Sequence, residues 1–87
     1  MIKGKTKSGF EYAIPKENLN NYELVEIISE VEENPLLVPK VVSLLLGKEQ
    51  SDKLKEHLRT ESGIVPADKM GDEITEVLNN HPEAKNS

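Results

Sequence analysis

The chain has 87 residues and a net charge of −5, with 11 basic side chains against 16 acidic ones and no cysteine. A chain of this length supports one hydrophobic core, and its hydrophobic content of 36% is well above that of a disordered protein. The acidic balance repels phosphate, so nucleic acid is not an expected partner. The lack of cysteine excludes disulfides and thiolate ligands, and no apolar run is long enough to cross a bilayer. We therefore expect an unprocessed cytoplasmic protein that makes no membrane contact.

The first fifteen residues alternate in the way that β-strands do. Lysines occupy alternate positions in the first half, at Lys3, Lys5 and Lys7. Apolar residues occupy alternate positions in the second half, at Phe10, Tyr12 and Ile14. A period of two is typical of strands, and the glycine of Ser8-Gly9 supplies the positive φ that a tight turn needs. The pattern predicts a two-stranded β-hairpin over residues 1–15. Because two strands are not stable alone, its apolar side chains are expected to pack on helices.

The lysine row has two interpretations. Lysines on an edge strand protect it from pairing with other chains, and we favour this interpretation. The alternative is an electrostatic contact between the lysines and an acidic protein surface.

The first two helices are marked by asparagine, proline and glycine. Asn20 is the predicted cap of the first, whose apolar residues repeat at helical spacing until it ends near Glu33. The second begins either at Pro35 or at Pro39, because a proline inside a helix removes a backbone hydrogen bond. It ends at Gly47, a residue suited to the left-handed position after a helix.

Two further helices complete the predicted bundle. The third runs from Lys48 to Thr60, is mostly solvated, and ends before Gly63. The fourth follows Pro66 and ends near Leu78, and its acidic residues are expected to face water; these are Asp68, Asp72, Glu73 and Glu76. The predicted fold is therefore mostly α, of the α+β kind, with one domain over residues 1–78. It consists of the hairpin (1–15) and a bundle of four short helices (20–78), followed by a flexible tail (79–87).

No set of residues has the spacing of a catalytic or metal site. His57 and His81 have no second ligand at the spacing of a metal site, which favours a surface or core-edge position over a metal or catalytic role. The carboxylate pairs Glu32-Glu33 and Asp72-Glu73 are adjacent in sequence and therefore splay apart on a helix. The hairpin glycines do not form a phosphate-binding loop. We expect no enzyme activity, no cofactor and no metal.

The second helix is more apolar than folding requires. Its apolar side chains cover an arc of roughly 200°, whereas a surface helix needs about 100°. Such a helix is either the centre of the core or partly exposed to a partner helix or to a second copy of the chain. The candidate partner-binding residues are Leu37, Val41, Leu44 and Leu45.

Several segments between residues 21 and 78 resemble a known family. They are Asn21-Tyr22-Glu23-Leu24, Glu33-Asn34-Pro35-Leu36, the stretch from Pro39 to Gly47, His57-Leu58-Arg59 and Gly63-Ile64-Val65-Pro66. They are similar to small tail assembly chaperones encoded by siphophages and prophages of Gram-positive bacteria. The resemblance implies a protein of the host cytoplasm that binds the tape-measure protein, holds its apolar helices soluble and helps to bring tail-tube subunits to it. It carries over no site residues.

Two other classes of function stay open. One is a minor structural or connector protein of the phage tail, and the other is a small regulatory adaptor unrelated to phage. Neighbouring genes for a tail-tube protein and a tape-measure protein would favour the chaperone, whereas presence in purified virions would favour the structural protein.

Overall fold

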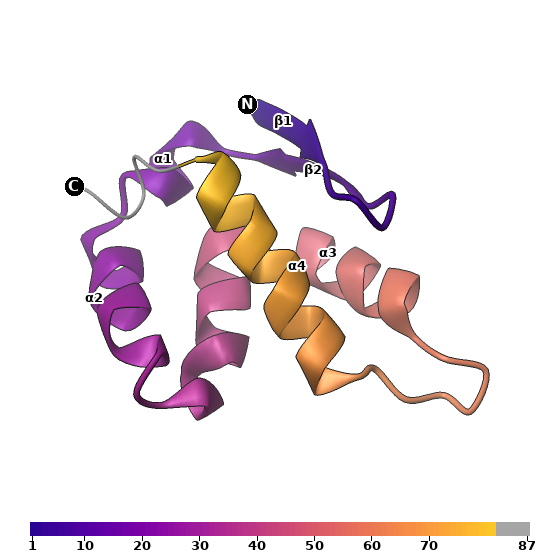
Figure 1. Cartoon of the computed structure of the whole chain (residues 1–87). Coiled ribbons are helices and arrows are strands. Elements are labelled where there is room, and N and C mark those ends of the chain that lie inside the picture. The colour runs from indigo at the N-terminus through magenta and orange to yellow at the C-terminus, as the bar shows by residue number, and fades with distance from the viewer. Residues whose placement is uncertain (82–87) are drawn as a thin grey trace.

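A computed structural model of the protein describes residues 1–81. The elements in chain order are β1 (Ile2–Lys5), β2 (Glu11–Ile14), α1 (Lys16–Leu19), α2 (Tyr22–Val31), the 3-10 turn η1 (Pro35–Leu37), α3 (Val38–Leu58) and α4 (Ala67–Asn80). An N-terminal hairpin followed by four helices confirms the predicted fold class. The hairpin lies at one end of the helices, and α4 packs across α3 (Figure 1).

The hairpin has the predicted turn. Its strands pair antiparallel, with Ile2 opposite Ile14 and Gly4 opposite Tyr12. The turn is closed by the N–H of Gly9, which donates to the carbonyl of Thr6 at 3.0 Å. Gly9 has a φ of 96°, the left-handed conformation that glycine adopts without strain.

The hairpin and the helices share one core. Its buried hydrophobic residues are Phe10, Tyr12, Ile14, Leu19, Leu24, Val41, Val42, Leu45, Leu46, Leu54, Ile74, Val77 and Leu78. The three hairpin residues in this set are the alternating apolar ones, which confirms that the hairpin packs on helices.

The beginnings of the helices differ in detail from the prediction. Asn21 caps α2, through a hydrogen bond from the Glu23 N–H to its side chain at 3.0 Å, so the prediction of Asn20 as the cap is wrong. Asn20 instead follows α1, a short helix that was not predicted. The predicted second helix begins close to the later of its two proposed starts, because α3 begins at Val38, one residue before Pro39. Pro35 begins the separate 3-10 turn η1.

Gly47 divides α3 into two segments. Its φ of 79° and ψ of 171° are not helical, so the chain bends there before the helix resumes. The prediction of a positive φ at Gly47 is confirmed. The second segment ends at Leu58, two residues before the predicted end.

The fourth helix is longer than predicted. It continues past Leu78 to Asn80, and the next residue, His81, lies against the hairpin with its Nε2 3.0 Å from the Tyr12 hydroxyl. The first two residues of the predicted tail therefore belong to α4 and the third contacts the hairpin, whereas the rest of the predicted flexible tail (82–87) lies outside the described residues. None of the helices within residues 1–81 has the length and apolar character needed to span a membrane.

Candidate functional site

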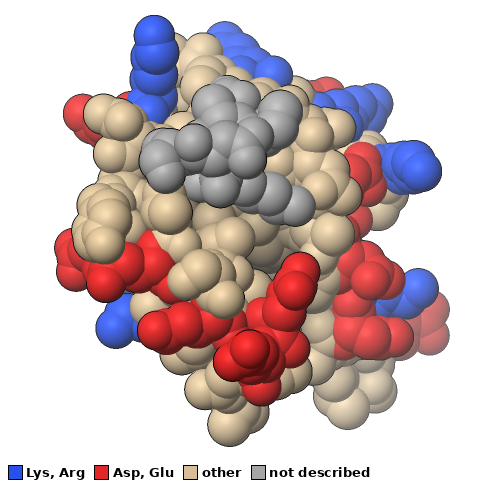
Figure 2. Space-filling model, turned by 60° about the vertical axis from the view of Figure 1, so that its left-hand side comes forward, with Lys and Arg blue, Asp and Glu red and all other residues tan. Residues whose placement is uncertain are grey.

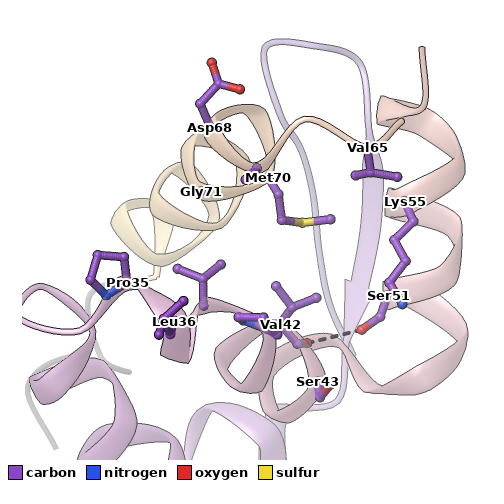
Figure 3. A pocket seen from close by; sticks show the side chains of 13 residues that line it. Pro35, Leu36, Val42, Ser43, Ser51, Lys55, Val65, Asp68, Met70 and Gly71 are labelled. Carbon is purple, nitrogen blue, oxygen red and sulfur yellow. Dashed lines mark hydrogen bonds between the residues drawn. The ribbon is translucent and has the colours of Figure 1, made fainter. Parts of the chain in front are cut away.

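A groove of about 670 Å³ lies between η1, α3 and α4. One wall is formed by η1 and the first segment of α3, and the other by the second segment of α3, the loop before α4 and the first turns of α4 (Figure 3). The lining residues are Pro35, Leu36, Val38, Pro39, Val42, Ser43, Ser51, Lys55, Val65, Ala67, Asp68, Met70 and Gly71.

The groove is mainly apolar and open to solvent. In Figure 3 the side chain of Met70 points into it from α4, above Val42. The hydroxyl of Ser51 donates to the Val42 carbonyl at 3.3 Å, so this buried polar group is satisfied within the protein. Leu36 has 85% of its surface exposed, a larger fraction than the other exposed large hydrophobic residues, Met1, Tyr22 and Ile64. A surface of this kind favours apolar side chains of a partner over a polar ligand.

The structure separates the four candidate partner-binding residues from this groove. Val41 and Leu45 are 1% and 0% exposed, so both are core residues with no surface to offer a partner. Leu37 and Leu44 are half-buried, and Leu44 packs against the core. None of the four lines the groove, which uses other residues of the same segment.

The groove was not predicted because it depends on tertiary packing. The apolar pair Val38 and Val42, four residues apart, gave a local signal for a second apolar face on this helix. Nothing in the sequence indicated that Met70 of α4 would lie over that face. The excess of apolar surface on the predicted second helix is thus divided between the core and the groove.

A polar cluster joins the hairpin turn to α3 and α4. Glu73 is only 6% exposed, so the prediction that it faces water is wrong. Its Oε1 accepts hydrogen bonds from the hydroxyls of Thr6 at 2.8 Å and Ser8 at 2.9 Å. The Oγ of Ser8 also lies 3.0 Å from Nε2 of His57, and the Lys7 N–H donates to Glu76 at 2.8 Å.

The cluster contains a serine, a histidine and a carboxylate, but hydrogen bonds connect them in a different order from that of a catalytic triad. A nucleophilic serine donates its proton to histidine Nε2, and the carboxylate orients the other ring nitrogen. Here the carboxylate of Glu73 contacts the serine instead, and no described residue is bonded to the other nitrogen of His57. The Ser8 hydroxyl has one proton, so donation to Glu73 leaves its oxygen as an acceptor for the His57 N–H. This arrangement favours a structural tie between the turn and the two helices.

Charge is unevenly distributed over the surface. Figure 2 shows most of the basic side chains at the end of the molecule where the hairpin and α1 lie, and a band of acidic side chains across the helices. The hairpin and α1 hold Lys3, Lys5, Lys7 and Lys16. In α3, a hydrogen bond from Lys48 and its charge hold the pKa of Asp52 below its usual value.

The described residues hold no group of three or more side chains suited to bind a metal ion. Every buried side-chain nitrogen or oxygen among residues 1–81 has a hydrogen-bond partner, so none is left to receive a ligand in the interior. Comparisons of the chain with protein-family models, with curated proteins and with solved structures find no match.

Proposed function

We propose that this protein is a tail assembly chaperone of the siphophage type, and that the groove binds apolar helical segments of a tape-measure protein. The observation that carries the proposal is the open apolar groove between the first segment of α3 and the start of α4. The resemblance of residues 21–78 to tail assembly chaperones supplies the identity of the partner.

The composition of the groove suits transient binding of apolar helices. An amphipathic helix binds by laying apolar side chains at positions i, i+3 and i+4 into a hydrophobic groove. Burial of such side chains contributes roughly 25 cal/mol per Å², and this contribution is not screened by salt as an ion pair would be. The exposed Leu36 lines the groove, where a partner helix would cover it.

Co-expression with a tape-measure fragment tests the proposal. The wild type is expected to keep the fragment soluble and to co-purify with it in high salt. Leu36→Asp places a charge in the groove at a site with 85% exposure, so it is expected to abolish co-purification without unfolding the protein. Circular dichroism checks that the variant is folded.

The matched control is Tyr22→Asp, which adds the same charge at another exposed hydrophobic residue, 73% exposed and outside the groove. It is expected to bind as the wild type does. Equal binding by the two variants would place the interaction elsewhere, and the half-buried Leu37 and Leu44 would be the next positions to change. Recovery of the protein from purified virions, without binding to the fragment, would instead support the structural tail protein.

A further inference from the structure

The hairpin has two edges, and α3 covers only one of them. β2 packs against α3, and the N–H of Ala13 donates to the side-chain oxygen of Gln50 at 3.2 Å. The opposite edge is formed by β1, which lies on the outer side of the molecule (Figure 1).

The register shows which backbone groups of β1 point outward. In an antiparallel pair, opposed residues alternate between those that bond to each other and those whose N–H and C=O point away. The Thr6 N–H bonds to the Phe10 carbonyl at 2.9 Å, so alternation makes Gly4 with Tyr12 the next bonded pair. The N–H and C=O groups of Lys3 and Lys5 therefore point away from β2.

The bond from Ala13 to Gln50 supports this assignment independently. Ala13 is the partner of Lys3, and its N–H points away from β1. The two members of such a pair point in opposite directions, so the N–H of Lys3 points away from β2. The open edge ends at the turn, where Glu76 accepts a hydrogen bond from the N–H of Lys7.

The side chains of the same two residues supply charge. Lys3 and Lys5 are exposed, and neither forms an ion pair or a side-chain hydrogen bond with another of residues 1–81. Residues directly opposite each other on neighbouring antiparallel strands have side chains on the same face of the sheet. An added strand with acidic residues at alternate positions would therefore place a carboxylate beside each lysine.

We propose that the β1 edge of this protein binds an extended acidic segment of another protein, with Asp or Glu at positions i and i+2, as a third strand of the hairpin. The backbone groups of Lys3 and Lys5 would bond to the segment, and their ammonium groups would pair with its carboxylates. A second copy of the chain does not fit this edge, because β1 paired with β1 would set lysine opposite lysine. The interaction is separate from the groove and does not depend on the chaperone function.

The first test uses NMR and a synthetic peptide, acetyl-Ser-Val-Glu-Val-Glu-Val-Ser-amide, against a peptide with lysines in place of the glutamates. Saturation with the acidic peptide is expected to slow hydrogen exchange of the Lys3 and Lys5 amides about tenfold. The amide of Gly4 already bonds within the hairpin and is expected to stay unchanged. The lysine peptide should have no effect. Failure of the acidic peptide to protect these two amides would overturn the proposal and leave the lysines as protection against aggregation.

Variants separate the contribution of charge from that of the backbone. Lys3→Glu with Lys5→Glu is expected to weaken binding of the acidic peptide at least about tenfold more than Lys16→Glu with Lys40→Glu. The second pair changes the net charge equally at exposed lysines outside the strand. Equal losses would show that only the overall charge matters.

Lys5→Pro removes the outward N–H of Lys5, whereas Lys5→Ala removes only the charge. The proline variant is expected to bind the acidic peptide about tenfold more weakly than the alanine variant. Equal affinity would show that the contact is electrostatic and adds no strand, which would overturn the proposal. Circular dichroism checks that Lys5→Pro folds, and if it does not, the amide exchange of the wild type decides.

Discussion

At the scale of single residues, Gly4 is needed because Tyr12 lies directly against it. The two residues are opposed in the hairpin, and a Cβ atom added to Gly4 would collide with Cζ and Oη of the Tyr12 side chain. Tyr12 is 3% exposed and its hydroxyl bonds to His81, so its ring has little space into which to move. Gly4→Ala is therefore expected to lower the free energy of unfolding by about 1 to 3 kcal/mol, as overpacking does in cores. Urea denaturation measures the change.

Gly71→Ala is the control for that substitution. Gly71 lies inside α4 and has no atom within 4 Å of the position that a Cβ would occupy. Alanine is preferred to glycine in a helix by about 1 kcal/mol, so this variant is expected to be more stable than the wild type. A loss of stability in both variants, or in neither, would show that the Tyr12 contact does not determine the requirement for Gly4.

The burial of Glu73 could not be predicted from the sequence. The helical spacing of α4 indicated that Glu73 faces water, because its apolar neighbours Ile74 and Val77 mark the buried side of the helix. The structure buries Glu73 as well, because the hydroxyls of Thr6 and Ser8, more than sixty positions away in the chain, offer it hydrogen bonds. A buried carboxylate requires such partners. No pattern within one helix can predict them.

At the scale of elements, the local residue pattern was sufficient to predict a helix or strand where it was compatible with only one structure. The alternation before Pro15 and the turn at Gly9 predicted the hairpin, and helical spacing predicted α2 and α4. The signals were ambiguous where two similar residues are adjacent. Asn20 and Asn21 both have the chemistry of a helix cap, and only the short helix α1 before them decides which one caps α2. The groove could not be predicted for a similar reason, since η1, α3 and α4 form it together.

The bend at Gly47 gives a prediction at this scale. Its φ of 79° and ψ of 171° lie in a region that is essentially restricted to glycine. No atom lies within 4 Å of the position of an added Cβ, so the cost of a substitution comes from the backbone alone. Gly47→Val is expected to lower the free energy of unfolding by about 1 to 3 kcal/mol. Thermal melting measures this, with Lys48→Ala at the next, exposed position as the control.

An unchanged melting temperature in Gly47→Val, together with a gain of helical signal, would show that α3 can run straight through this position. The bend would then not be required by the fold. Because the two segments of α3 contribute to opposite walls of the groove, a straight α3 would also remove the groove.

At the scale of the whole molecule, one core joins the hairpin to all the helices, which predicts a single cooperative transition. Phe10, Tyr12 and Ile14 are buried together with residues of α2, α3 and α4. Detachment of the hairpin from the helices would therefore expose the helical core to solvent. The chain has two tyrosines and no tryptophan, and Tyr22 is 73% exposed. Tyr22→Phe therefore leaves Tyr12 as the only strong fluorophore, at the centre of the hairpin, with little effect on stability.

In the Tyr22→Phe variant, the fluorescence of Tyr12 follows the hairpin and the far-ultraviolet circular dichroism follows mainly the helices. The two signals are expected to change at the same urea concentration and with the same slope, as in two-state unfolding. Circular dichroism of the wild type, measured in parallel, checks that the substitution leaves the midpoint unchanged. An earlier midpoint for Tyr12 would show that the hairpin opens while the helices stay folded. The hydrogen bonds from Thr6 and Ser8 to Glu73 would then be too weak to hold the turn on α4.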